Sequence, residues 1–250
     1  MIPSALILAG SRAGSADPVA LAEGVAHKAL VEVAGQPMLA RVVNALRAAG
    51  IERIAVSADA AEVVRMARDL GAEVLAPDAG PSGSVARGFA VLGAPMLVTT
   101  ADHALLQPQW IRQFMADTPA DADVAVLLAR REAVEAALPE SKRTWLRFAD
   151  GQWSGCNLFL LATPRAQNAL ATWNQVEADR KRPWRIAARL GPGTLWNYLR
   201  GRLSLQQVLG RLGDRIGVRA AAVAAADGLA AVDVDKLQDL HQVRQISGGQ

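Results

Sequence analysis

The feature that most constrains the fold is a regular alternation of short apolar runs and amphipathic segments in the first 110 residues. Strands of the buried type are expected at 4–10, 51–57, 72–77 and 95–100, and the helical patterns between them cover 37–49, 62–70 and 85–92. Strands that alternate with helices predict a parallel sheet covered by helices on both faces.

The second half of the chain has a different character. Further strands are expected at 123–130, at 217–225, at 230–235 and within 144–163, where Asp150-Gly151 predicts a hairpin turn. Residues 164–214 are mostly helical in pattern, broken at Pro183 and at 191–193, and a last helix is expected from Leu237. We therefore expect one domain over 1–245, with a helical insertion at about 164–214 and a disordered tail at 246–250.

Composition excludes some classes of site. Cys156 is the single cysteine, so the chain has no internal disulfide and no cysteine zinc cluster, and the simplest role for Cys156 is a small core residue. The N-terminal apolar run lacks the features of a signal peptide, and no window approaches the length of a spanning helix. The expectation is a cytoplasmic protein.

The stretch "LILAGSRAG", residues 6–14, is suited to binding an anion. Its glycines let backbone N–H groups point at a ligand, and Arg12 and the later Lys28 add positive charge. Neither G-x-G-x-x-G nor G-x-x-x-x-G-K-[ST] is present. An ordinary turn with solvated charges is the alternative.

Three carboxylates come at the ends of expected strands elsewhere in the chain. Asp102 comes just after the strand at 95–100, and Asp233 and Asp235 leave the expected strand at 230–235. Carboxylates from separate strands, without a Cys or His cluster, suit Mg²⁺ bridged to a phosphate. Asp102 could instead cap a helix that begins near Gln107, and Asp235 one that begins near Leu237; for Asp235 the cap is the favoured interpretation. Asp102 and Asp233 are the predicted metal ligands.

Five stretches in this order resemble the MobA-like NTP transferases, which are related to molybdenum-cofactor guanylyltransferase and to CTP-dependent cytidylyltransferases. They are "LILAGSRAG", "HKALVEVAGQPML", "GPSGSVARGF", "LVTTADHALL" and "VDVDKLQDL". The resemblance implies a three-layer α/β/α, Rossmann-like nucleotidyltransferase fold with a mixed, mostly parallel sheet. It also implies an Mg²⁺-dependent transfer of a nucleotide from an NTP to an acceptor, with release of pyrophosphate.

Carried over to this chain, the resemblance assigns a role to each motif. Arg12, Lys28 and Asp102 are the expected catalytic residues, and Asp102 and Asp233 the metal ligands. His103, next to Asp102, is interpreted as a loop histidine with local hydrogen bonds. The expected nucleotide-binding residues are Leu8, Ala9, Gly10, Ser11, Gly14, Ser82, Gly83 and Ser84.

The base and the acceptor are less constrained. Small residues in "GPSGS", the Ser84-Val85 pair and Gly88 favour CTP, with GTP as the second choice. Lys142, Arg143 and Asn157 could hold an acceptor phosphate, although a solvated loop and a backbone-bonded amide explain them equally well.

Basic residues are concentrated near the insertion. Residues 180–219 hold ten Lys or Arg against one acid, Asp214, together with Trp184, Trp196 and a leucine stripe. Basic and aromatic helices suggest a peripheral contact of about 180–215 with an anionic membrane or a lipid-linked acceptor. The favoured alternative is that the stripe packs on the sheet while the arginines face water. Nucleic acid is not expected, since no reader motif accompanies the charge.

Two further functions remain open at this point. One is a glycosyltransferase of similar fold that uses a nucleotide sugar, which the Arg12 and Lys28 pair argues against. The other is an inactive nucleotide-binding or scaffold module, which the presence of both Asp102 and Asp233 argues against.

Overall fold

A computed structural model describes residues 3–10, 17–139, 145–178, 193, 196 and 200–248 of the chain. Strands of its main sheet are β1 (Ser4–Leu8), β4 (Ile54–Ser57), β5 (Glu73–Leu75), β6 (Met96–Thr100), β7 (Val124–Arg130), β8 (Leu146–Phe148), β9 (Gly151–Leu161) and β10 (Ala220–Ala224). A small hairpin joins β2 (Glu32–Val33) to β3 (Gln36–Pro37). Its α-helices are α1 (Pro18–Ala22), α2 (Met38–Ala48), α3 (Ala61–Asp69), α4 (Pro81–Leu92), α5 (Pro108–Asp117), α6 (Arg131–Ala137), α7 (Ala166–Ala178), α10 (Leu205–Ile216) and α11 (Leu237–Gly248), and its 3₁₀ helices are η1 (Lys28–Leu30) and η2 (Gly228–Ala231).

The main sheet is mixed and mostly parallel. Its order is β10-β7-β9-β6-β1-β4-β5, and β8 pairs with β9 outside this path. Strand β9 is antiparallel to both β6 and β7, whereas β1 is parallel to both β4 and β6. The predicted fold class is confirmed.

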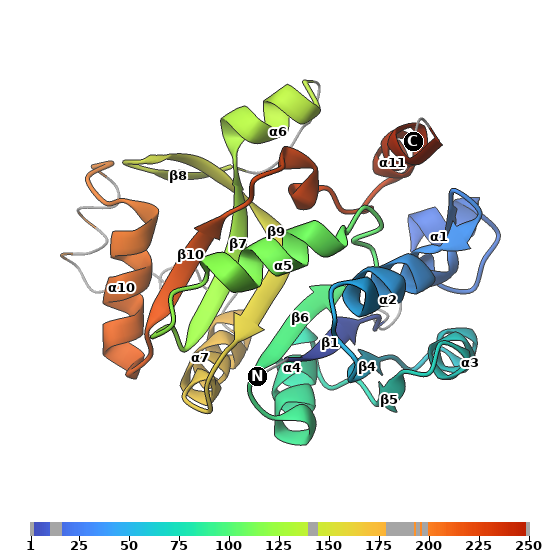
Figure 1. Cartoon of the computed structure of the whole chain (residues 1–250), viewed down its shortest axis with the longest axis horizontal. Helices are drawn as coiled ribbons and strands as arrows, with labels where there is room; N and C mark the ends of the chain where they lie inside the picture. Colours follow the sequence, from blue (N-terminus) through green and yellow to red (C-terminus); the bar gives the residue numbers. More distant parts are fainter. Residues whose placement is uncertain are drawn as a thin grey trace.

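Helices cover both faces of the sheet (Figure 1). On one face, alternate β1 residues such as Ala5 and Ile7 pack with α2, α3, α5 and α11. On the other face Leu6 packs against α4 and α7. Gly88 of α4 is fixed by this packing, because a Cβ there would lie 2.5 Å from Leu6 Cδ2. Its presence is therefore explained by a close helix-strand contact rather than by the nucleotide base.

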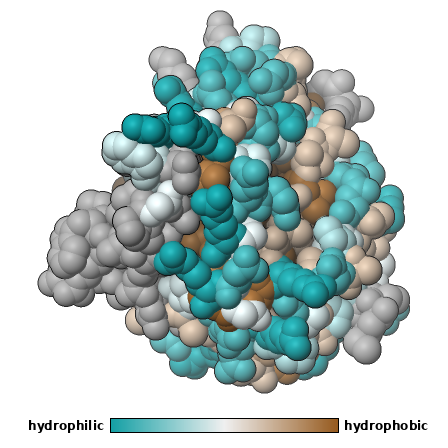
Figure 2. All heavy atoms as spheres, turned by 90° about the vertical axis from the view of Figure 1, so that its left-hand side faces the viewer, coloured by the Kyte–Doolittle hydropathy of each residue, from teal (hydrophilic) through white to brown (hydrophobic). Residues whose placement is uncertain are grey.

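The insertion helix α10 also packs on this second face. Leu205 is buried with Leu128 and Trp153, and Leu209 lies against the same cluster. On the left-hand side of Figure 1, where α10 lies, the coloured surface is mainly hydrophilic with small apolar areas between polar side chains (Figure 2). Of the predicted leucine stripe, Leu203 is buried and Leu209 packs against this cluster. Leu195 and Leu199 of the stripe, and the predicted breaks at Pro183 and 191–192, lie outside the described residues.

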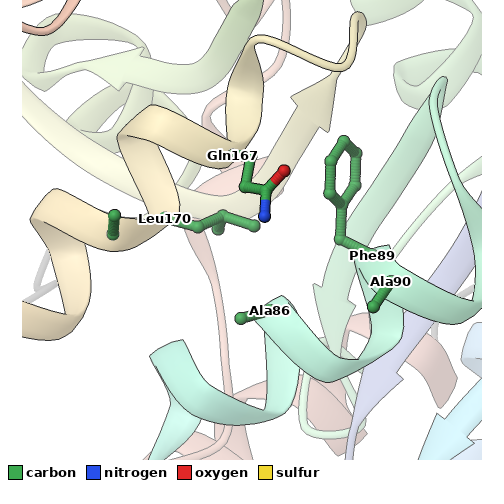
Figure 3. A pocket seen from close by; sticks show the side chains of 6 residues that line it. Ala86, Phe89, Ala90, Gln167 and Leu170 are labelled. Atoms are coloured by element: carbon green, nitrogen blue, oxygen red, sulfur yellow. The ribbon is translucent and has the colours of Figure 1, made fainter.

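A shallow apolar depression lies between α4 and α7. The side chains of Phe89 and Gln167 approach each other across it, beside Ala86 and Leu170 (Figure 3). None of the predicted site residues that the structure describes lines it.

The segment expected as a strand at 230–235 is instead η2 followed by extended chain. The backbone of η2 lies directly on α6, since a Cβ at Gly228 would be 2.1 Å from the Ala133 carbonyl oxygen. The Asp227 carboxylate accepts the Leu229 N–H and begins the 3₁₀ turn. Alternate residues Val232 and Val234 are still buried, so the period-two pattern reflects burial without a partner strand.

Two other boundaries differ from expectation. Helix α4 begins at Pro81 rather than near 85, because proline suits the first helical position and Gly80 supplies the turn before it with a φ of 95°. At the C-terminus α11 continues through residues 246–248, which were expected in the disordered tail, because Ile246 packs on the core. Residues 249 and 250 lie outside the described chain.

Candidate active site

The predicted site loops meet at one edge of the sheet. The Ala101 N–H donates to the Leu8 carbonyl (3.0 Å), and the Ala9 N–H donates to the Ser57 carbonyl (2.9 Å). These bonds extend the β6–β1–β4 ladder by one residue. Gly10 and Asp102 therefore leave neighbouring strands at the same carboxyl edge, where open parallel sheets bind ligands.

Lys28 reaches this edge from a capped 3₁₀ turn. The His27 ring accepts the Ala29 N–H through Nδ1 (3.0 Å) and begins η1, and Lys28 is its first residue. Lys28 Nζ lies 2.7 Å from Asp102 Oδ2 and 3.6 Å from Asp235 Oδ1. A cation predicted to bind phosphate is thus held between two carboxylates.

Burial and charge act in opposite directions on this lysine. Only 18% of each of the Lys28 and Asp102 side chains is exposed. Burial by itself would lower the pKa of Lys28, but the carboxylates of Asp102 and Asp235 raise it above its ordinary value. Lys28 is therefore a fixed positive charge at neutral pH.

The C-terminal carboxylates are brought to Asp102 by the chain around Val234. The Val234 N–H donates to the Asp102 carbonyl (3.1 Å), and Asn157 Nδ2 donates to Asp233 Oδ2 (2.8 Å). Partial burial and the nearby charge of Asp233 raise the pKa of Asp235, and Lys28 opposes this rise. Lys28, Asp102, Asp233 and Asp235 thus form one charged cluster.

Asp235 does not have the capping role that was favoured for it. Its carboxylate faces Lys28, and Asp239 accepts the N–H groups of Asp235 (3.0 Å) and Lys236 (2.8 Å) at the start of α11. The spacing of Asp233 and Asp235 contained the signal: on an extended chain, residues two apart point to the same side. Asp102 caps no helix either, because α5 begins at Pro108 without a side-chain cap.

The residues present fit a hard cation. Asp102 Oδ1 is buried and accepts no hydrogen bond from the described residues, although its partner oxygen is paired with Lys28. Within the described ranges, no three His, Cys, Asp or Glu side chains are grouped to hold a metal ion. Two carboxylates with the remaining positions left to water and phosphate is the arrangement that Mg²⁺ commonly takes.

The expected base-recognition turn lies on the first turn of α4. Ser84 Oγ accepts the Asp78 N–H (2.9 Å) and donates to the Gly80 carbonyl (3.1 Å), so this hydroxyl shapes the turn. Ser82 is buried, and a Cβ at Gly83 would lie 3.0 Å from Asp78 Cβ. The turn is therefore compact, with its small residues in close contact with the preceding loop.

Several predicted residues are not placed. Ser11, Arg12, Gly14, Lys142 and Arg143 lie outside the described residues, and their roles stay predictions. Cys156 is buried, as expected of a core residue. His103 is also buried and stacks near Trp110, with ring centroids 6.4 Å apart.

One structural ion pair was not expected. Arg244 of α11 binds the Glu23 carboxylate with two nitrogens and also donates to the Glu32 carbonyl. Glu23 and Glu32 flank Lys28 in sequence, so α11 holds both ends of the segment that carries this lysine. Figure 1 shows α11 beside α1. The sequence contains no local signal for a contact between residues so far apart.

A three-layer α/β fold whose sheet edge presents a lysine, three aspartates and glycine-rich loops defines a nucleotide-handling transferase. The chain belongs to the MobA-like NTP transferase domain family, whose pattern matches residues 5–192, and this is a family of nucleotidyltransferases.

Several solved structures share the fold of this chain. A hypothetical transferase from Thermus thermophilus is 33% identical, with a TM-score of 0.82 over 96% of this chain and 100% of its own. CMP:2-keto-3-deoxy-manno-octonic acid synthetase complexed with CTP shares the fold at 20% identity and a TM-score of 0.58, over 98% of this chain and 99% of its own. The 2-C-methyl-D-erythritol 4-phosphate cytidylyltransferase from Thermus thermophilus does so at 16% identity and a TM-score of 0.56, over 99% and 100%.

Proposed function

We propose that this protein is an Mg²⁺-dependent nucleotidyltransferase that transfers NMP from an NTP to a phosphorylated acceptor and releases pyrophosphate. The observation that carries the proposal is the position of Lys28 between Asp102 and Asp235, beside Asp233, at the edge where Gly10 leaves the sheet. This position supports the proposal, because a cation and a pair of candidate metal ligands lie at the sheet edge from which the predicted triphosphate loop starts.

In the proposed reaction an oxygen of the acceptor phosphate attacks the α-phosphorus of the NTP in line. A new P–O bond forms, the bond from the α-phosphorus to the bridging oxygen breaks, and pyrophosphate leaves with the electron pair. The protein's part is to position two anions and to offset their charge.

Each charged side chain of the cluster has a defined part in this scheme. Lys28 supplies positive charge to the phosphates, for which it is already positioned by η1. Asp102 and Asp233 would hold Mg²⁺, which when bound neutralises charge on phosphate oxygens. If Asp102 binds Mg²⁺ in place of Lys28, Asp235 would still hold Lys28 in the site, because the Asp235 carboxylate is the second contact of the Lys28 ammonium group.

For the base we propose CTP first and GTP second. The named activities of two structures with this fold involve CTP or a cytidylyl group, which supports the first choice by analogy of fold. At the turn 82–84, where the base is predicted to bind, the Ser84 hydroxyl is already bonded within the turn, so recognition there would rest on the backbone.

The membrane hypothesis is restricted by the packing of α10. Because Leu203 and Leu205 are buried and Leu209 packs against the sheet, segment 180–215 would bind an anionic surface by charge. Arg200, Arg202 and Arg211 are exposed, and Arg200 lies over the ring of exposed Trp196 at 4.3 Å. None of the described helices is long and apolar enough to cross a bilayer. A peripheral contact remains a prediction.

The test is pyrophosphate release with each of the four NTPs and a panel of phosphorylated acceptors. We expect Asp102→Ala to abolish release while the fold is retained. A matched control is Asp121→Ala, since Asp121 forms an ion pair with Arg219 that is mostly exposed and belongs to no site. Turnover of Asp102→Ala at the wild-type rate would overturn the assignment, as would a reaction that needs only a nucleotide sugar.

A further inference from the structure

We propose that Asn157 is a positioning residue for Asp233. The proposal rests on the proposed function, since it concerns how one of the two candidate metal ligands is held. Asn157 was predicted at the acceptor site, but its amide lies against the carboxylate cluster and donates to Asp233 Oδ2 over 2.8 Å.

The first observation is a bulge in β9. Val126 of β7 pairs with Phe159 and Leu128 pairs with Gly155, so Leu127 faces three residues of β9, 156–158. Asn157 is the middle one, and its φ of 47° lies in the left-handed region. Apart from glycine, asparagine and aspartate adopt this region most readily. Bulges are frequent next to active sites, where they redirect a side chain.

The second observation is the end of the neighbouring ladder. Strand β6 pairs with β9 only as far as Val98 and Phe159. Beyond that point the Asp102 carbonyl accepts the Val234 N–H instead. The bulge in β9 therefore begins where the pairing of β9 with β6 ends, next to the place where residues 232–234 approach Asp102.

The third observation is that both partners are anchored by their neighbours. Asn157 lies between Cys156 and Leu158, whose exposed fractions are 1% and 0%. Asp233 lies between Val232 and Val234, which are buried as well. With the flanking side chains fixed in the core, the hydrogen bond holds the Asp233 carboxylate in one orientation.

This arrangement explains why an amide is present at 157. Asparagine combines tolerance of the left-handed backbone with a donor that adds no charge beside Asp102, Asp233 and Asp235. Aspartate would fit the backbone but would repel the cluster. Outer partners that orient metal ligands are commonly worth about 10- to 100-fold in metal affinity or activity.

The matched variants separate backbone shape from the amide. Asn157→Gly keeps the left-handed conformation and removes the donor, whereas Asn157→Asp keeps the shape of the side chain and replaces the donor with a charge. Asn168→Ala is the control, because Asn168 Nδ2 donates to the Ile216 carbonyl (3.0 Å), away from the cluster. Thermal unfolding of each variant establishes that it is folded.

The readouts are binding of Mn²⁺ alone, followed by the free-ion electron paramagnetic resonance signal, and the apparent KM for Mg²⁺ in pyrophosphate release. We expect Asn157→Gly to weaken Mn²⁺ binding about tenfold or more and to raise the Mg²⁺ KM more than it lowers kcat. Asn157→Asp should bind Mn²⁺ but lose turnover, since the added carboxylate can bind the cation at a position that does not support the reaction.

A double variant tests whether Asn157 acts through Asp233. Asn157→Gly combined with Asp233→Asn should bind Mn²⁺ no more weakly than Asp233→Asn alone, because residues in one hydrogen-bonded unit are not additive. Wild-type Mn²⁺ binding by Asn157→Gly, with binding lost in Asp233→Asn, would overturn the positioning role and leave the proposed function intact. Unchanged binding in both Asp102→Asn and Asp233→Asn would overturn the metal site and the positioning role together.

Discussion

Replacing Lys28 with methionine is expected to separate cation binding from turnover. Methionine keeps much of the length and apolar volume of the lysine stem but removes the charge that lies 2.7 Å from Asp102 Oδ2 and 3.6 Å from Asp235 Oδ1. The variant leaves Asp102, Asp233 and Asp235 without their shared counter-ion, so a divalent cation should bind them more tightly while the phosphates lose a positive contact.

The magnitude follows from the separation and the burial of the ion pair. Two unit charges 4 Å apart interact with about 1 kcal/mol in water and about 4 kcal/mol at the effective dielectric constant of about 20 near a protein surface. The Lys28 and Asp102 side chains are each 18% exposed, which places them between these limits. Since a tenfold change in affinity corresponds to about 1.4 kcal/mol, Mn²⁺ alone should bind Lys28→Met about 10- to 100-fold more tightly.

Isothermal titration with Mn²⁺ measures the affinity, and pyrophosphate release measures turnover. We expect turnover to fall by about 100-fold or more, in the range seen when one charge-stabilising donor is removed from an active site. The control is Lys236→Met, because Lys236 is exposed and forms no ion pair with the described carboxylates of the cluster. Unchanged or weaker Mn²⁺ binding by Lys28→Met would refute the reasoning that Lys28 and a metal ion compete for Asp102.

Three other predictions test the loop, the core and the surface. Gly10→Ala should leave the melting temperature unchanged, because its Cβ would meet Pro77 Cβ at an ordinary 3.7 Å, but should raise the KM for NTP if the backbone approaches a phosphate there. The Asp123 carboxylate is buried and accepts the Arg219 N–H and the Thr163 hydroxyl, which hold its pKa below the ordinary value against the effect of burial. Asp123→Asn should therefore cost about 1–3 kcal/mol of unfolding free energy at neutral pH. The difference from wild type in chemical denaturation should begin to shrink as the pH falls below about 4, because the carboxylate of the unfolded chain takes up a proton before the native one does, and a constant difference would contradict the assignment. In flotation with anionic vesicles at low salt, a protein that binds through residues 180–215 should float and be released by salt, and no binding would remove the membrane hypothesis.

Much of the fold could be predicted because each element carries its own local pattern. The strands at β1, β4, β5, β6, β7 and β10 are apolar runs bounded by turn residues. The β8–β9 hairpin was also predicted, but its loop is Ala149-Asp150, one residue before the expected Asp150-Gly151, because Phe148 pairs with Gly151. Elements whose pattern is short or depends on a neighbour were missed or mistaken. Helix α6 and the β2–β3 hairpin were not expected. Residues 230–235 were mistaken for a strand because their burial alternates as in a strand, although the segment starts in η2, which packs on α6.

In the site, too, some features could be predicted from the sequence and others could not. The residue types and the order of the motifs were readable in the sequence, which is why Lys28, Asp102 and Asp233 could be named and grouped with the family. Their partners were not readable. Lys28 meets Asp102 across 74 residues and Asn157 meets Asp233 across 76.

The sequence by itself determined most of the strands and helices and the position of Asp102 after a strand, because hydrophobic period and turn chemistry act over a few residues. Only the tertiary structure decided that Asp235 faces a lysine and that a bulge turns Asn157 toward a carboxylate. Side-chain pairing depends on strand order and register, which are set by packing of the whole sheet and leave no signal in any short stretch of the chain.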